Sequence, residues 1–131
     1  MIIIEGPGNI ANKKKAMNLV RPQGIWIAAS VKNAFNVPRN HNYAVYNNGK
    51  FVGFALLSPE NNKTLYLNVI VTEPGHGYGS ALINRIKSNA RKKNFKKINL
   101  NSVNEARKFY EKMGFKKSSN IRIPSRFSFT F

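Results

Sequence analysis

Hydrophobic and polar residues alternate along the middle of the chain with the period of two that is typical of β-strands. Two such runs make up Asn42–Ser58, and they flank Asn48-Gly49, a dipeptide that favours the tight turn of a β-hairpin. A third run, Thr64–Val71, follows turn-forming residues at Glu60–Lys63. The pattern therefore predicts three consecutive antiparallel strands.

The hydrophobic period changes in the second half of the chain. A helical period begins at Gly79 and continues to Lys92, with the basic residues on the opposite side. A short strand at Lys97–Asn101 and a helix at Asn104–Met113 come next. Alternating aromatic residues then predict a final strand within Ile121–Phe131, interrupted by a proline.

The N-terminal third adds an edge strand and two helices. The strand is expected at Ile2–Ile4 and should end at the turn-forming sequence Gly6-Pro7-Gly8. The helices are expected at Asn12–Leu19 and Ile25–Phe35. Together these elements predict a single α/β (α+β) domain over residues 1–131, with a mixed, mainly antiparallel central sheet and flanking helices.

Three glycines at alternate positions, Gly75, Gly77 and Gly79, separate the third strand from the helix that follows. Glycine lets the backbone approach a ligand closely, and a helix N-terminus offers free N–H groups with a partial positive charge. The loop therefore predicts a phosphate-bearing ligand. A Walker site is disfavoured because Ser80-Ala81 stands in place of Lys-Ser/Thr. A Rossmann site is disfavoured because the glycine spacing differs and no acidic ribose partner follows.

Two motifs make the chain resemble the GCN5-related N-acetyltransferases (GNAT). The pyrophosphate loop of that family reads Arg/Gln-x-x-Gly-x-Gly/Ala. Its glycines fall on Gly77 and Gly79, although Pro74 occupies the first position here. A later motif places an Asn at a helix start, then Ala, Phe-Tyr-Glu-Lys and x-Gly-Phe, here Asn104, Ala106, Phe109-Tyr110-Glu111-Lys112 and Gly114-Phe115. With the hairpin, the resemblance covers Val45–Phe115.

The resemblance implies that the strands Thr64–Val71 and Lys97–Asn101 splay apart, and that acetyl-CoA is the co-substrate without any metal. In such a fold the pantetheine arm pairs with the backbone that the gap exposes, and the glycine loop holds the pyrophosphate. Asn104 would cap its helix and hydrogen-bond to the pantetheine. The implied cofactor-binding residues are Val69, Ile70, Val71, His76, Gly77, Tyr78, Gly79, Ser80 and Asn104.

Acetyl transfer to an amine requires a proton donor for the leaving sulfur and a proton acceptor for the amine. Tyr110 stands at the family's donor position, although it can instead be a core aromatic beside Phe109. Many members carry a Glu on the third strand, which this chain lacks. The candidate acceptors are Glu73 and a water positioned by Asn68 or by a backbone carbonyl, and an amine of low pKa could also lose its proton to solvent. Basic residues on the two helices are candidates for the coenzyme's 3′-phosphate: Arg85, Lys87 and Lys112.

The composition excludes several kinds of chemistry. The chain has no cysteine, so thiolate catalysis and disulfides are absent, and its two histidines lie far apart in the sequence, so no metal site is expected. No hydrophobic run is long enough to span a membrane, and no export signal is recognisable, so we expect a cytoplasmic protein.

The charge is strongly unbalanced, because 22 Lys and Arg residues face five acidic ones for a net charge of +17. Compositional drift, steering of the coenzyme, binding of RNA or another polyanion, and attraction to a membrane surface all remain open. The last lacks a supporting amphipathic helix. Few acids also favour acceptors that are neutral or anionic overall.

The expected function is direct transfer of an acetyl group from acetyl-CoA to a primary amine of a small molecule or a macromolecule. Two alternatives keep the fold. In one, the acceptor amine is borne by RNA, as in aminoacyl-tRNA. In the other, the domain is catalytically degenerate and only binds CoA or nucleic acid. The oligomeric state stays open.

Overall fold

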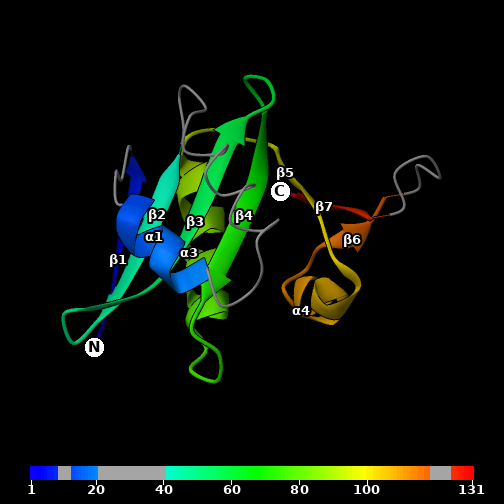
Figure 1. The fold of residues 1–131 in the computed structure, drawn as a ribbon. Coiled ribbons are helices and arrows are strands. Elements are labelled where there is room, and N and C mark those ends of the chain that lie inside the picture. The colour runs from blue at the N-terminus through cyan, green and yellow to red at the C-terminus, as the bar shows by residue number, and fades with distance from the viewer. Residues whose placement is uncertain (9–12, 21–40, 119–124) are drawn as a thin grey trace.

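The computed structural model describes residues 1–8, 13–20, 41–118 and 125–131 (Figure 1). Within these ranges the chain forms a seven-stranded sheet in the order β1-β2-β3-β4-β5-β7-β6. The strands are β1 (Ile2–Gly8), β2 (Asn42–Asn47), β3 (Lys50–Pro59), β4 (Thr64–Thr72), β5 (Lys97–Asn101), β6 (Lys116–Lys117) and β7 (Arg126–Thr130). The helices are α1 (Lys13–Val20), α3 (Tyr78–Lys92), the 3-10 turn η2 (Asn104–Ala106) and α4 (Arg107–Lys112). The helix expected at Ile25–Phe35 lies outside the described residues.

The sheet is mixed and mainly antiparallel, as the sequence predicts. β1 to β4 pair in antiparallel succession, β4 pairs with β5 in parallel, and β7 pairs antiparallel with both β5 and β6. The predicted hairpin is confirmed at Asn48-Gly49, where φ is 51° and 78°. Both values are left-handed, which Asn tolerates and Gly adopts freely, so this dipeptide suits the two-residue turn.

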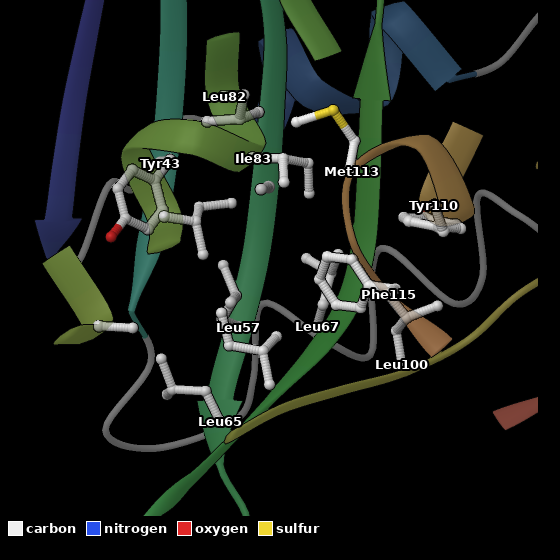
Figure 2. Close-up of a cluster of buried hydrophobic side chains, with 14 of the residues drawn as sticks. Tyr43, Leu57, Leu65, Leu67, Leu82, Ile83, Leu100, Tyr110, Met113 and Phe115 are labelled. Carbon is white, nitrogen blue, oxygen red and sulfur yellow. The ribbon is translucent and has the colours of Figure 1, made fainter. Parts of the chain in front are cut away.

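Helices cover both faces of the sheet (Figure 1). On one face, α3 buries Leu82, Ile83 and Ile86, which share one side of the helix, against strand residues such as Leu57 and Leu67 (Figure 2). Burying a side chain of this size contributes about 1.5–3 kcal/mol. This layer is the main hydrophobic core, and it fixes α3 with its N-terminus beside the end of β4.

The opposite face carries a smaller core under α1. Ala16 and Val20 of that helix are buried against Phe54 and Leu56 of β3. Their spacing of four residues places them on the same side of α1, while Lys14 and Lys15 are exposed, with the Lys15 ammonium 5.6 Å from the centre of the Tyr46 ring. Among the described helices, none is long and apolar enough to cross a membrane.

The expected splay between β4 and β5 is present. The two strands pair in parallel only from Thr64↔Lys97 to Leu67↔Leu100, whereas β4 continues beside β3 as far as Gly53↔Thr72. Among the described strands, the part of β4 after Leu67 therefore has no partner on the β5 side. Its backbone N–H and C=O groups on that edge are available to a ligand.

A β-bulge lies where this splay begins. Leu56 pairs with Val69 and the next residue, Leu57, pairs with Leu67, so Asn68 is the extra residue in β4. An inserted residue changes which side chains face which side of a sheet. As a result Ile70, like Leu67, lies on the face that carries the main core.

The N-terminal strand differs from its prediction. Gly6 and Pro7 do not turn the chain, because β1 runs through them to Gly8, which pairs with Asn42. A Cβ on Gly6 would lie 2.5 Å from the Asn42 carbonyl oxygen, and φ there is +132°. Gly6 thus allows β1 to pack closely on β2. In the sequence, a glycine that is needed for close packing looks the same as one that is needed for a turn.

The C-terminal elements also depart from the predicted boundaries. The helix expected at Asn104–Met113 begins as the 3-10 turn η2 and has only six α-helical residues. β6 was not expected, and it pairs with β7 at the outer edge of the sheet. The predicted final strand is confirmed for Arg126–Thr130, while residues 119–124 lie outside the described ranges.

Candidate active site

A cleft of about 410 Å³ opens at the splayed end of the sheet. Its walls come from the unpaired end of β4, the glycine loop, the first turn of α3, and one side of η2 and α4. The lining residues are Ile70, Val71, Thr72, Glu73, Pro74, Gly75, Gly77, Tyr78, Gly79, Ser80, Ala106, Phe109 and Tyr110. The two motifs singled out in the sequence thus meet in one cavity.

The glycine loop delivers a helix N-terminus to this cleft. Gly75 and Gly77 have φ values of 82° and 75°, which favour glycine strongly, and Gly77 precedes the first residue of α3. The first helical hydrogen bond runs from the Ala81 N–H to the Gly77 carbonyl at 3.2 Å. The N–H groups of Gly79 and Ser80 therefore have no acceptor within the helix. With the helix dipole, they form an anion-binding end to the cleft.

Tyr78 fixes the start of α3. Its side chain is buried, and its hydroxyl accepts a hydrogen bond of 2.9 Å from the Asn47 amide at the end of β2. The exposed ring of His76 stacks on Tyr78 with centroids 5.0 Å apart. His76 does not line the cleft. The role assigned to it from the sequence, contact with the pyrophosphate, stays a prediction for its backbone N–H.

Tyr110 belongs to both the core and the cleft. Its ring packs edge-on against Phe109 and Phe115, and it lies at the margin of the main core cluster (Figure 2). It also lines the cleft. Burial raises the pKa of Tyr110 to about 12, so its hydroxyl stays protonated at neutral pH and can donate a hydrogen bond. The two readings of this residue, structural and functional, are therefore compatible.

Comparison with known proteins identifies the domain. The family model described as "Acetyltransferase (GNAT) domain" matches residues 21–130, which is most of the chain. The chain belongs to the GNAT acetyltransferases. No curated protein sequence matches it.

Solved GNAT structures share the fold over nearly the whole chain. GCN5 of Tetrahymena superposes with a TM-score of 0.81 at 14% identity, covering 98% of this chain and 95% of that one. An aminoglycoside 6'-N-acetyltransferase complexed with coenzyme A gives 0.76 at 18% identity, covering 98% and 96%. The ribosomal-protein-S18-alanine N-acetyltransferase of Escherichia coli gives 0.76 at 18%, covering 98% and 91%. These identities support the shared fold alone.

The cleft of this GNAT domain fits the co-substrate of its family, acetyl-CoA. One end offers free N–H groups of a helix start to a pyrophosphate. The adjoining wall is the unpaired edge of β4, suited to an extended, amide-bearing arm. Of the three β4 residues assigned to that arm, Ile70 and Val71 line the cleft, whereas Val69 packs with the core under α1. Val69 can therefore contribute to binding of the arm only through its backbone groups.

Asn104 does not have the capping role expected of it. It is the first residue of η2, its side chain is exposed, and the residue at the cap position is Val103, which makes no side-chain cap bond. The prediction of an Asn104 cap is wrong because the segment opens as a 3-10 turn from extended backbone. Asn104 does not line the cleft, and its contact with pantetheine stays a prediction.

The two candidate proton acceptors occupy different settings. Asn68 forms the bulge at the start of the splay, is exposed, and donates a 3.0 Å hydrogen bond to the Ser58 hydroxyl. Glu73 lines the cleft, but its carboxylate lies 2.7 Å from the Lys50 ammonium. That salt bridge directs the Glu73 side chain towards the β2–β3 turn.

The basic residues of α3 that were assigned to the 3′-phosphate make other contacts. Lys87 donates to the Met113 carbonyl and lies 4.0 Å above the Phe129 ring, and burial lowers the pKa of its amine. Arg85 donates to the Ile4 carbonyl of β1 at 3.2 Å. None of the three basic residues lines the cleft. The contacts of Arg85 and Lys87 disfavour a role at the 3′-phosphate, whereas Lys112 lies at the exposed end of α4, and its role stays a prediction.

Sequence reasoning missed two residues that shape the site. Tyr78 was considered only for its backbone, yet its buried ring anchors α3. Phe109 was considered only as core packing, yet it forms a wall of the cleft opposite the glycine loop. The sequence signal for the second was Gly79, a glycine inside a helix, which often marks a close approach by another element.

Proposed function

We propose that this GNAT domain transfers the acetyl group of acetyl-CoA directly to a primary amine, with Tyr110 as the donor to the leaving sulfur. The observation that carries the proposal is the position of a protonated phenol in the same cleft as the helix N-terminus and the unpaired edge of β4. A hydrogen-bond donor, an anion-binding helix start and an unpaired strand edge thus line one cleft.

The reaction needs few groups from the protein. The neutral amine nitrogen attacks the thioester carbon, the C–N bond forms, and the C–S bond breaks with its electron pair passing to sulfur. Tyr110 donates to that sulfur as negative charge develops. Its pKa of about 12 exceeds the ordinary thiol value of about 8.5, so hydrogen-bond donation stabilises the thiolate more readily than full proton transfer.

The proton lost by the amine must leave by another route. We infer that the side-chain oxygen of Asn68 positions a water for this task, because its NH₂ group donates to Ser58 while its oxygen accepts no hydrogen bond from the described residues. Glu73 is the alternative acceptor. Its salt bridge to Lys50 disfavours that role, since the carboxylate would have to release the lysine to take a proton.

The acceptor is proposed to be neutral or anionic overall. All five glutamates of the chain lie among the described residues, and only Glu73 lines the cleft. A polycationic amine would meet a surface of the same sign. The test measures CoA-thiol release from acetyl-CoA with matched panels of amino acids, monoamines and polyamines. Turnover confined to the polyamines would refute this acceptor class.

A second candidate has an RNA-borne amine, such as aminoacyl-tRNA, as acceptor. It is favoured by the net charge of +17, which would hold a polyanionic substrate close to the cleft. The same panel extended to an aminoacylated RNA separates the two, because only this candidate predicts turnover that falls steeply with added salt. A protein that binds CoA but acetylates no member of the panel would favour the degenerate alternative.

A further inference from the structure

A second hollow, of about 360 Å³, lies at the outer edge of β7 and shares no lining residue with the cleft. It is lined by side chains of β5, β6 and β7 and by the turn after α4. We call it the β7 groove, and its residues are Lys97, Gly114, Lys116, Lys117, Ser118, Ser128 and Thr130.

The groove exists because β6 is short. Lys116 pairs with Ser128 and Lys117 with Phe127, and the same register places Gly114 opposite Thr130. Gly114 has no side chain to fill the space, and its φ of +90° together with the Phe129 ring 3.2 Å from a built Cβ keeps that position a glycine. The outer edge of β7 is therefore open beside three lysines.

The charge in the groove is one-sided. Three lysines line it, Lys97, Lys116 and Lys117, and no glutamate is among the lining residues. Among the described residues, which include every glutamate of the chain, the ion pairs are Lys50 with Glu73 and Arg126 with Glu60. The three groove lysines are thus not neutralised by a glutamate. The Ser128 hydroxyl donates to the Asn99 side-chain oxygen at 2.6 Å, so the Thr130 hydroxyl is the neighbouring donor suited to an anion.

The basic surface continues beyond the groove. The Lys96 N–H donates to the Lys63 carbonyl at 2.7 Å, which brings two more exposed lysines to the same end of the sheet as Lys97. A ligand with one phosphate would use few of these charges, whereas a chain of phosphates can follow them.

The coenzyme cannot account for this surface. The phosphate loop lies at the N-terminus of α3, while Lys97 follows its C-terminus. Fifteen helical residues separate the two ends, a length of about 22 Å at ~1.5 Å per residue. The steering of acetyl-CoA therefore requires none of the groove lysines.

We propose that the β7 groove binds the phosphodiester backbone of a single-stranded nucleic acid. Electrostatic attraction to phosphates is independent of base sequence and strongly dependent on salt. A flexible single strand can enter a narrow hollow at a strand edge, which a rigid duplex fits less well. The inference does not rest on the acceptor proposed above, because binding here requires neither acetyl-CoA nor an amine.

The test compares two matched pairs of adjacent, exposed lysines in the full chain. Lys116→Gln/Lys117→Gln alters the groove, and Lys14→Gln/Lys15→Gln removes the same charge from α1. Fluorescence anisotropy measures binding of a labelled oligouridylate across a salt series, and thermal melts verify that both variants fold. Loss of two phosphate contacts should reduce the magnitude of the slope of log K against log salt by about 1.4. At ~0.1 M salt this corresponds to an affinity about 25-fold lower.

We expect that loss of oligouridylate affinity in Lys116→Gln/Lys117→Gln and a much smaller loss in Lys14→Gln/Lys15→Gln. The affinity for acetyl-CoA should be unchanged in both variants. Equal losses would show that net charge alone attracts RNA, and the groove would not be a site. Absence of oligouridylate binding by the unaltered protein near physiological salt would overturn the proposal. A fall in acetyl-CoA affinity in the groove pair would also overturn it, since the groove would then belong to the coenzyme site.

Discussion

Gly79 in the first turn of α3 lies directly against the ring of Phe109 from α4. A Cβ built on Gly79 would be 3.3 Å from Cζ of Phe109, closer than side chains usually pack. This contact sets how near the two helices come, and both residues line the cleft. The glycine of the loop motif and the aromatic of the later motif are therefore one structural unit, although 30 residues separate them in the sequence.

Replacing Gly79 by Ala should weaken coenzyme binding while leaving the stability of the fold almost unchanged. The methyl group displaces Phe109 by a few tenths of an ångström and narrows the anion-binding end of the cleft. Alanine also favours the helix by about 0.5–1 kcal/mol, which offsets the strain. We expect a near-unchanged melting temperature with weaker acetyl-CoA binding, measured by calorimetry. Asn84→Ala, on the exposed side of α3, is the control and should bind normally. Unchanged binding in Gly79→Ala would mean that this contact does not shape the site.

Replacing Tyr110 by Phe tests its chemical role. The hydroxyl has no hydrogen-bond partner among the described residues, so its removal should leave the fold intact. We expect kcat to fall by about 10²–10³-fold, the usual cost of removing one hydrogen-bond donor to developing negative charge, with acetyl-CoA affinity retained. Turnover equal to that of the unaltered protein would leave Tyr110 with a packing role only.

Tyr110 should also make stability fall at alkaline pH. Its pKa is raised from 10.0 to about 12 by burial, so the folded state holds this proton more tightly than the unfolded state. The stabilisation is complete below pH 10 and is lost between pH 10 and about 12, where the unfolded chain ionises first. The loss amounts to about 2–3 kcal/mol. Denaturant titrations at both ends of this range should show a larger drop for the unaltered protein than for Tyr110→Phe, and equal drops would contradict the burial of this phenol.

The proton acceptor is tested by a pair of substitutions. Asn68→Ala removes the oxygen proposed to position the water and should lower kcat about tenfold or more, with little change in KM. Glu73→Gln breaks an exposed salt bridge with Lys50, whose stabilising effect is small, and should keep most of the activity. Comparison of the two pH–rate profiles decides the assignment, because loss of the acid limb only in Glu73→Gln would identify the carboxylate as the base.

The sequence predicted the local features of this fold well. The hairpin at Asn48-Gly49, the splayed pair of strands and the glycine loop all follow from periodicity, from residues with unusual backbone freedom, and from the family motifs. These signals are local or fixed by family resemblance. The elements that they predict are therefore found in the structure with boundaries close to those expected.

The features that escaped prediction depend on contacts between distant segments. The bulge at Asn68 is visible only once β3 and β4 are paired, and it moves Ile70 to the core-facing side. Lys87 is a 3′-phosphate candidate in the sequence, yet its amine contacts the Phe129 ring and the Met113 carbonyl, both from the far end of the chain. The predicted cap at Asn104 is wrong for a different reason. The helix begins with a 3-10 turn, which the residues of this segment do not signal.

Calorimetric titration with acetyl-CoA, desulfo-CoA and ATP tests the central claim most directly. Desulfo-CoA keeps the pantetheine and pyrophosphate but lacks the sulfur, and ATP has phosphates without the pantetheine. If the glycine loop and the free edge of β4 hold the coenzyme, acetyl-CoA and desulfo-CoA should bind with Kd values on the order of micromolar, and ATP much more weakly. Absence of binding by a folded sample, or equal binding of ATP, would contradict the assignment of this cleft to acetyl-CoA.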